Sequence, residues 1–159
     1  MLTLNAHAKI NFFLKVFGKR PDGYHDIESL MLPLELHDRL ELEEADSGIS
    51  LWCDRTDLGD VKQNLVYRAA KLLEPKCRKL KGINIRLHKN TPVAAGLGGG
   101  SSDAAAALMG LNRLWELDLS LPQLSDLAAR LGSDVPFFIL NKPAIATGRG
   151  CNGCQPQGE

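Results

Sequence analysis

The strongest local signal in the sequence lies at residues 92–102, which read Pro92-Val-Ala-Ala-Gly96-Leu-Gly98-Gly-Gly100-Ser-Ser102. Four of the five positions 96–100 are glycine, and an alanine-rich run follows almost directly. Glycine has no Cβ, so such a turn can wrap its N–H groups around an anion. A helix predicted from about Ser102 to Trp115 would add further N–H groups and a partial positive charge at the same point. The segment therefore indicates a phosphate-binding loop in front of a helix.

Other interpretations of this loop differ in how well they fit the residues. A glycine-rich surface loop with a serine cap stays open as an alternative, because a glycine motif alone is a weak signal. A Walker-type P-loop is excluded, since it needs Gly-Lys followed by Ser or Thr, and no lysine occurs between Lys89 and Lys142. A Rossmann turn is excluded because residues 88–95 separate the preceding strand from the glycines.

The composition is that of an ordinary globular protein of one domain. Its 159 residues include 19 Lys plus Arg and 19 Asp plus Glu, so the formal net charge is zero. A general nucleic-acid binder usually carries a basic excess, so we expect no nucleic-acid partner. No apolar run reaches the ~18 residues of a membrane span, and no signal peptide is visible, so we expect a cytoplasmic protein without a membrane partner. The four cysteines are irregularly spaced and are expected to be reduced thiols.

Alternation of apolar and polar residues predicts several strands. It is clearest over Ile83–Leu87 and is also present over Arg39–Glu43. Ile49–Cys53 is expected to be the hairpin partner of Arg39–Glu43, across the turn at residues 46–48. The apolar and aromatic run Lys9–Val16 predicts a further strand.

Caps and periodicity predict two more helices. Asn64 is a suitable N-cap for an amphipathic helix that Pro75 closes. Ser120 and Gln123 form a capping box for the next helix, which ends at Gly132. The order of strands, helix, strand, helix and helix predicts an α+β fold, in which the helices pack on one face of a mixed β-sheet.

Two charged residues occupy positions where an isolated charge is not expected. Lys9 enters an apolar strand, and Asp134 lies just before the apolar run Phe137–Leu140. If the two side chains meet, each charge offsets the burial of the other. A carboxylate near a hydroxyl nucleophile suits phosphoryl transfer, in which positioning and charge stabilisation supply the rest. The alternative, an aspartate that caps a turn and a lysine that snorkels from a strand end, stays open.

Four segments together resemble the GHMP kinases, the superfamily of galactokinase, homoserine kinase, mevalonate kinase and phosphomevalonate kinase. They are Ala8–Asn11, Arg20–His25, Pro92–Ser102 and Gly132–Pro136. The glycine loop is shared by the superfamily. The residues Asp22-Gly-Tyr-His resemble the branch that phosphorylates 4-diphosphocytidyl-2-C-methyl-D-erythritol in the non-mevalonate pathway to isoprenoids. The resemblance implies a GHMP-kinase N-terminal, ATP-binding domain over residues 1–150, with a ribosomal S5 domain 2-like fold.

The resemblance also implies the reaction and the roles of individual residues. A phosphoryl group would pass from ATP, with Mg²⁺, to the 2-hydroxyl of a small-molecule cytidyl diphosphate substrate. Asp134 would be the general base and Lys9 its charged partner, while Asn11, Tyr24 and His25 would contact the substrate. Two alternatives are another GHMP activity, of homoserine or mevalonate type, and a non-catalytic nucleotide-binding role. The residues expected to bind ATP are Asn64, Pro92, Val93, Ala94, Ala95, Gly96, Leu97, Gly98, Gly99, Gly100, Ser101 and Ser102.

The last residues depart from the family pattern. Family members are nearly twice as long, so we expect the C-terminal GHMP domain to be absent and turnover to be impaired. Residues 151–159 are expected to be a disordered, non-family tail, because they contain almost nothing to bury. Cys151 and Cys154 form half of a zinc motif without a second half, so no protein metal site is expected. Apolar surface left exposed would favour self-association, for example as a homodimer.

Overall fold

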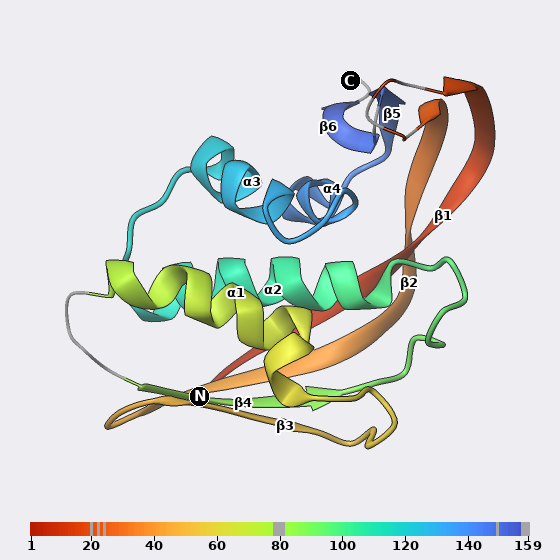
Figure 1. The fold of residues 1–159 in the computed structure, drawn as a ribbon. Coiled ribbons are helices and arrows are strands. Elements are labelled where there is room, and N and C mark those ends of the chain that lie inside the picture. The colour runs from red at the N-terminus through yellow and green to blue at the C-terminus, as the bar shows by residue number, and fades with distance from the viewer. Residues whose placement is uncertain (20, 22, 24, 78–81, 149, 157–159) are drawn as a thin grey trace.

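A mixed β-sheet carries the helices on one side, as the computed structural model of the protein shows (Figure 1). The structure describes residues 1–19, 21, 23, 25–77, 82–148 and 150–156. The strands are β1 (Leu2–Lys19), β2 (His25–Ala45), β3 (Ile49–Cys53), β4 (Gly82–His88), β5 (Ala144–Gly148) and β6 (Gly150–Pro156). The helices are α1 (Leu65–Leu73), α2 (Gly99–Leu114), α3 (Leu121–Ala129) and α4 (Val135–Leu140), with 3-10 turns at Val61–Gln63 and Glu74–Lys76. The predicted α+β class is confirmed.

The long strand β2 joins two parts of the sheet. Its C-terminal half pairs with β4, its N-terminal half pairs with β5, and β1 runs antiparallel along both halves. The register of β1 against β2 shifts between His7 and Lys9, where Pro33 faces Lys9. Bulges bend a strand, and they are where proline is tolerated within a sheet. In Figure 1 the β1–β2 ladder rises past the end of α2 toward β5. The Lys9 amide, next to this bulge, donates to Leu97 O in the loop before α2.

The predicted hairpin between Arg39–Glu43 and Ile49–Cys53 is wrong. Strand β4 lies between β2 and β3 in the sheet, and β3 pairs with β4 in parallel, from Ile49↔Ile83 to Cys53↔Leu87. The alternation of side chains identifies each strand correctly. It fixes which residues face the core, but it does not say which strand becomes the neighbour.

The core lies between the sheet and helices α1 and α2. Ile83, Ile85 and Leu87 of β4 are buried against the helices, while the residues between them are exposed on the other face. Helix α2 approaches the sheet closely at Gly110, where an added Cβ would lie 2.4 Å from Leu42 Cδ1. A larger residue at position 110 would force the helix away from the strands, so this glycine sets the spacing of the two layers.

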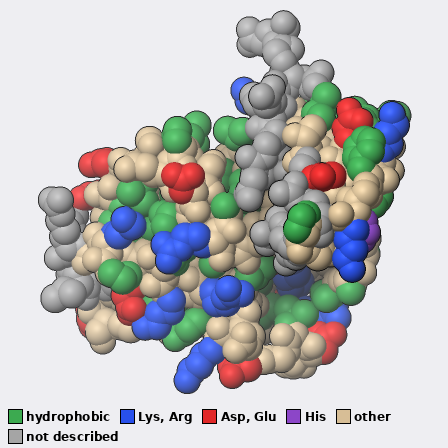
Figure 2. All heavy atoms as spheres, turned by 45° about the horizontal axis from the view of Figure 1, so that its top comes forward, with side chains coloured by type: hydrophobic (Ala, Val, Ile, Leu, Met, Phe, Trp, Pro, Cys, Tyr) green, Lys and Arg blue, Asp and Glu red, His purple; other side chains and the backbone are tan. Residues whose placement is uncertain are grey.

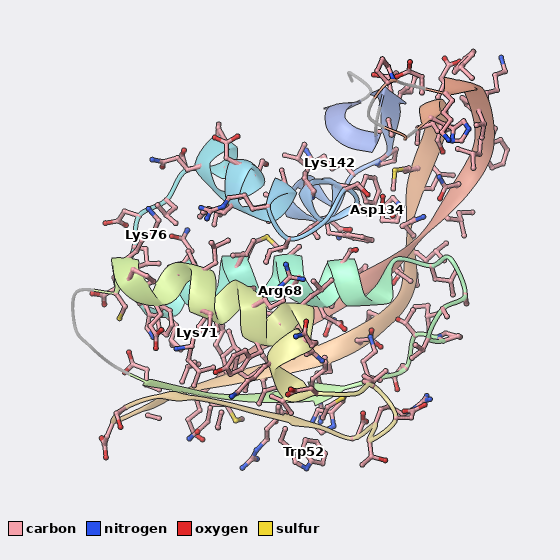
Figure 3. All side chains as sticks on the ribbon, in the orientation of Figure 1. Trp52, Arg68, Lys71, Lys76, Asp134 and Lys142 are labelled. Carbon is pink, nitrogen blue, oxygen red and sulfur yellow. The ribbon has the colours of Figure 1, made fainter. Side chains whose placement is uncertain are left out.

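The opposite face of the sheet carries polar and aromatic side chains. Trp52 projects from it, away from the helices (Figure 3), and is 53% exposed. Its ring meets that of His88 edge-on, with centroids 5.4 Å apart. On the helical side, basic and acidic side chains are interspersed (Figure 2), in keeping with the zero net charge of the sequence. Within the described ranges, no helix is both long and apolar enough to cross a membrane, and the cytoplasmic location stays a prediction.

Three further segments differ from the sequence-based expectations. Helix α2 begins at Gly99, so two of the loop glycines belong to its first turn. The apolar run at Val135–Leu140 forms helix α4, which was not predicted. The prediction of a disordered tail is corrected for residues 151–156, because Gly150–Pro156 is strand β6 and pairs antiparallel with β5. Such pairing uses main-chain groups and therefore does not need apolar side chains; residues 157–159 lie outside the described part.

Candidate active site

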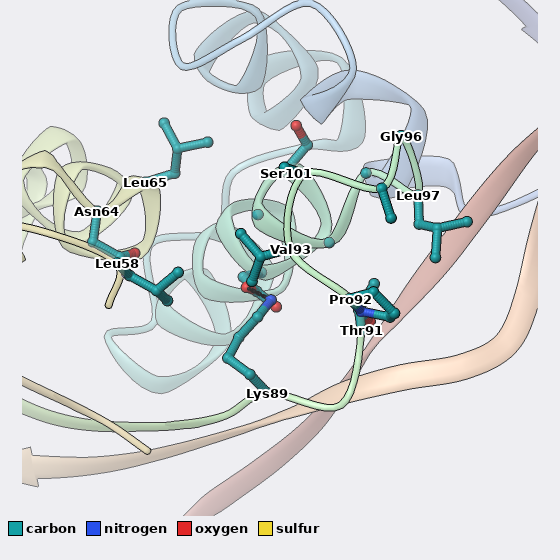
Figure 4. A pocket seen from close by; sticks show the side chains of 16 residues that line it. Leu58, Asn64, Leu65, Lys89, Thr91, Pro92, Val93, Gly96, Leu97 and Ser101 are labelled. Atoms are coloured by element: carbon teal, nitrogen blue, oxygen red, sulfur yellow. Dashed lines mark hydrogen bonds and ion pairs between the residues drawn. The ribbon is translucent and has the colours of Figure 1, made fainter. Parts of the chain in front are cut away.

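The glycine loop and the first turn of α2 form one wall of a pocket of about 340 Å³ (Figure 4). Leu58, Asn64 and Leu65 form the facing wall, and the Lys89 side chain reaches in from below. Asn64 also caps α1 as predicted, since its Oδ1 accepts from the Val66 amide at 2.9 Å. Of the residues predicted to bind ATP, those that line the pocket are Asn64, Pro92, Val93, Ala94, Ala95, Gly96, Leu97, Gly98, Gly99, Gly100 and Ser101.

Ser102 is the exception among these residues. Its side chain is buried, it does not line the pocket, and its amide donates to Gly98 O at 2.9 Å as part of the helix. The contact of Ser102 with ATP therefore stays a prediction. Because α2 starts at Gly99, residues 99–101 are half-buried or exposed, whereas the Ser102 side chain already points into the core.

The start of α2 has free hydrogen-bond donors. Its N-cap residue Gly98 is left-handed, with φ 71°, and makes no side-chain cap. The first N–H groups of a helix have no partner within the helix, and their dipoles favour an anion. The loop before α2 is strained at Ala94, a residue other than glycine that has a positive φ, of 58°. Positive φ is uncommon outside glycine and is found where a loop is held for function. This corner of the pocket suits a phosphate group.

Lys9 and Asp134 meet beside this loop. Lys9 Nζ lies 3.7 Å from Asp134 Oδ2, and the Lys9 side chain is 7% exposed against 38% for Asp134. Asp134 stands at the N-cap of α4 but makes no cap hydrogen bond, so the turn-capping alternative does not describe it. In Figure 3 Asp134 lies between the helices and the β1–β2 ladder. The carboxylate is held by a buried cation while one side stays open to a substrate.

A chain of hydrogen bonds also holds the Lys9 ammonium group in place. Lys9 Nζ donates to Asn11 Oδ1 at 2.5 Å, and Asn11 Nδ2 donates to Ser29 Oγ at 2.7 Å. Ser29 Oγ in turn donates to Phe13 O at 2.7 Å, and Ser29 is fully buried. The resemblance implied a substrate contact for Asn11, but the sequence offered no sign of Ser29, which comes from the neighbouring strand β2. These contacts leave Lys9 little freedom to move.

The pair and the pocket share atoms through the glycine loop. The Lys9 amide donates to Leu97 O at 2.9 Å. A Cβ added to Gly98 would lie 3.2 Å from Lys9 Cε and 2.7 Å from Phe138 Cζ. Only a glycine lets the loop, the lysine and helix α4 approach so closely. The structure thus brings Lys9, Asn11, Asp134 and the N-terminal end of α2 into one site.

A second charged cluster under the loop was missed by the sequence reasoning. Lys89 Nζ forms ion pairs with Asp38 Oδ2 and with Asp103 Oδ2, the latter at 2.6 Å. Asp38 Oδ1 also accepts the amides of Asn90 at 2.6 Å and Thr91 at 2.7 Å. Asp103 follows Ser102 in an alanine-rich helix, and an acidic residue at a buried helical position was the one signal that could have revealed it.

Burial and pairing shift the pKa values of all three groups. Burial raises the pKa of Asp103 to about 7, against the opposing attraction of Lys89. Burial alone would also raise the pKa of Asp38, but the bonds from Lys89 and from the Thr91 and Asn90 amides outweigh it and lower that pKa. Burial alone would lower the pKa of Lys89, and the two carboxylates reverse this and raise it. Asp103 is therefore the member of the cluster that takes up a proton near neutral pH.

The predicted substrate-binding pair is only partly described. Tyr24 lies outside the described residues. His25 is exposed, begins β2 opposite Lys19, and does not line the pocket of the glycine loop. Its place at the outer end of the β1–β2 ladder separates it from the phosphate corner, so a substrate that touched both would have to be extended.

Apolar side chains are exposed along the same ladder, and self-association through them stays a prediction. Among the described residues, no group of three or more His, Cys, Asp or Glu side chains is placed to hold a metal ion. The exposed apolar side chains of β1 are Phe12, Phe13, Leu14, Val16 and Phe17.

Comparison with known proteins finds a family model and several similar kinases. The family model "GHMP kinases N terminal domain" matches residues 64–142. The chain is 50% identical over 148 residues to the 4-diphosphocytidyl-2-C-methyl-D-erythritol kinase of a Synechococcus species, covering 93% of this chain and 48% of the relative. It is 54% identical over 151 residues to the kinase of the same name from Pelotomaculum thermopropionicum, covering 94% of this chain and 53% of the relative.

Solved structures agree in fold. A crystal structure of 4-(cytidine 5'-diphospho)-2C-methyl-D-erythritol kinase matches with a TM-score of 0.86 and 40% identity, over 98% of this chain and 55% of that one. A mevalonate kinase matches with a TM-score of 0.72 and 15% identity, over 99% of this chain and 56% of that one, which shows a common fold. The chain spans about half the length of the curated relatives it matches.

Proposed function

Because the chain belongs to the GHMP kinases, of which it carries the N-terminal domain, we propose that it supplies the ATP site and the catalytic carboxylate for phosphorylation of an alcohol. The acceptor we propose is the 2-hydroxyl of 4-diphosphocytidyl-2-C-methyl-D-erythritol. The observation that carries the proposal is the contact of Lys9 with Asp134 directly beside Gly98. An ion pair and a phosphate-binding corner at one point are what transfer to a hydroxyl requires.

The pocket fits the donor nucleotide. Its volume of about 340 Å³ lies within the range of small-molecule sites. The phosphates would lie against the N–H groups of residues 98–101, and Asn64 on the facing wall would contact the adenosine side. Mg²⁺ would be held mainly by the phosphates, with the Ser101 hydroxyl as the protein group in reach, and when bound it would neutralise charge on the phosphate oxygens.

Asp134 would act as the general base. Its Oδ2, 38% exposed at the side-chain level, would accept the proton of the attacking hydroxyl as the new bond to the γ-phosphorus forms and the bond from that phosphorus to the leaving ADP oxygen breaks. Lys9 would hold the carboxylate in place through their ion pair. Asn11, locked by Lys9 and Ser29, would position the acceptor. Tyr24 and His25 would recognise the cytidine, for which a ring face and an imidazole are suited.

An ADP-release assay with candidate substrates tests this proposal. We expect release with the cytidyl diphosphate compound, at the impaired rate predicted above, and none with homoserine or mevalonate. Turnover of either of those two alone would assign the chain to another GHMP activity. ATP binding measured by calorimetry without any ADP release would leave a nucleotide-binding domain and remove the catalytic assignment. Absence of both binding and release would contradict the proposal outright.

A further inference from the structure

A buried group of three charges lies under the loop and takes no part in the proposed chemistry. The side chains are exposed by only 4% for Lys89, 0% for Asp38 and 3% for Asp103. A buried ion cluster of this kind adds little stability compared with apolar side chains of similar size, because each charge loses its hydration. Its presence beneath the nucleotide pocket therefore calls for a role other than general stability.

Each member of the cluster comes from a different segment of the fold. Asp38 is in β2, Lys89 follows the end of β4, and Asp103 is in the second turn of α2. Lys89 is thus the cation through which the sheet and the helix are joined. Separated by 51 residues from Asp38 and by 14 from Asp103, it closes two loops at once.

Asp38 also holds the start of the loop directly. Its Oδ1 accepts the amides of Asn90 and Thr91, the two residues just before Pro92. A Cβ added at Gly99 would lie 3.3 Å from Asp38 Oδ2 and 3.0 Å from Thr91 Cγ2. The first turn of α2 therefore rests on the same carboxylate that orients the loop amides.

We propose that Asp38, Lys89 and Asp103 form an ion triad that positions the nucleotide-binding loop on the N-terminus of α2. Asp38 fixes the direction in which the chain enters the loop, and Lys89 ties that entry to Asp103 in the helix. Loop amides and helix N–H groups then face one phosphate group together, without reorganising when it binds. That this loop binds a nucleotide rests on the proposed function. The positioning of the loop by the triad is a property of the protein without any ligand.

Two measurements on the same variants test the triad. The variants are Lys89→Met, Asp38→Asn and Asp103→Asn, with Lys71→Met as the matched control, since Lys71 pairs with Glu74 at 2.7 Å on the exposed end of α1. Without nucleotide, we expect hydrogen exchange of the Asn90 and Thr91 amides to speed up about tenfold or more, the equivalent of one lost charge-assisted bond. The dissociation constant for ATP, measured by calorimetry, should rise by a similar factor, and the control should move neither value.

Recovery with a different cation separates positioning from packing. Lys89→Arg keeps the charge but not the shape, so it should restore part of the exchange protection that Lys89→Met loses. If Lys89→Met does not fold, Asp103→Asn, which keeps the Lys89–Asp38 pair, provides the comparison. Wild-type exchange rates and ATP affinity in a folded Asp103→Asn and Asp38→Asn would overturn the proposal. If the wild type binds no ATP, the proposed function fails, while the exchange rates still decide whether the triad holds the loop.

Discussion

The two lysine clusters of the site are built from the same groups but differ in how they meet water. At Lys9 a buried ammonium faces Asp134 at 3.7 Å, and that carboxylate is 38% exposed. At Lys89 a buried ammonium faces two carboxylates that are exposed by 3% or less. Both clusters are bonded to the segment that contains the glycine loop, Lys9 through its amide to Leu97 O and the triad through Asp38 to the Asn90 and Thr91 amides.

The difference separates a reactive pair from a structural one. A base must reach its substrate, so it needs one open side and a fixed partner behind it. A positioning group needs the reverse, since contacts that water cannot enter hold their geometry better. A lysine–carboxylate contact is therefore assigned a catalytic role where the carboxylate is exposed, and a positioning role where the carboxylate is buried.

Removing the partly exposed Asp134 carboxylate should abolish the reaction and leave the fold intact. In Asp134→Asn we expect turnover to fall by about 10²–10⁴-fold, the range for loss of a general base. Its free energy of unfolding should change by less than about 1 kcal/mol, because the pair is partly exposed. Asp126→Asn, an exposed carboxylate on α3, is the control. ADP release and urea unfolding measure the two quantities. Full turnover in Asp134→Asn would remove the assigned base.

Removing the buried Lys89 ammonium group should instead lower the stability of the fold. Lys89→Met leaves two buried carboxylates without their partner, so we expect a loss of about 3–5 kcal/mol in the free energy of unfolding. Lys9→Met leaves a carboxylate that water can reach, and about 1–2 kcal/mol is expected from the lost bonds. Urea unfolding of both variants under one condition gives the difference. Equal losses would show that exposure does not distinguish the clusters.

The closed cluster should also give the protein a pH dependence that the variant Asp103→Asn lacks. Burial raises the pKa of Asp103 to about 7, so between about pH 4 and pH 7 the folded state keeps a proton that the unfolded state has released. Raising the pH through this window therefore removes stability. At roughly 1.4 kcal/mol per pKa unit, the wild type should lose about 2–3 kcal/mol relative to Asp103→Asn between pH 5 and pH 7.5.

Unfolding free energies of both proteins at those two pH values measure this. Asp38, whose pKa is lowered, acts in the opposite direction and only at acid pH, where its stabilisation is lost as the pH falls. Parallel pH profiles of the wild type and Asp103→Asn would show that Asp103 is ionised throughout this range.

Three neighbouring glycines offer the finest test. Gly98→Ala adds a Cβ at a left-handed position, 2.7 Å from Phe138 Cζ, and should cost about 2–3 kcal/mol. Gly99→Ala presses on Thr91 at 3.0 Å and should cost about 1 kcal/mol. Gly100→Ala meets nothing within 4 Å, so it should gain up to about 1 kcal/mol from helix propensity. Thermal or urea unfolding ranks them, and a costly Gly100→Ala would contradict the packing described for the loop.

Local signals in the sequence were reliable wherever one segment decides its own structure. The capping box at Ser120 and Gln123 is present as predicted, and so is the Asn64 cap. The alternation in Ile83–Leu87 correctly gave its buried and exposed faces. In each case the interacting groups lie within a few residues of one another, so the sequence states the interaction directly.

The order of the strands was beyond such signals. The predicted hairpin failed because a turn and two alternating runs fit an antiparallel pair and a parallel neighbour equally well. β4, from later in the chain, inserted beside β2 and completed the layer that α1 and α2 cover. Burial of the whole face, rather than any property of residues 39–53, selected that arrangement.

The glycine loop, the helix that follows it and the apolar faces of the strands could be predicted from the sequence, since these depend on backbone freedom and side-chain periodicity. The contact of Asp134 with Lys9 and the enclosure of Lys89 by two carboxylates become visible only in the folded protein. The physical reason is that an ion pair depends on distance and exposure in space. Both are set by how the sheet bends and the helices pack, and spacing along the chain records neither.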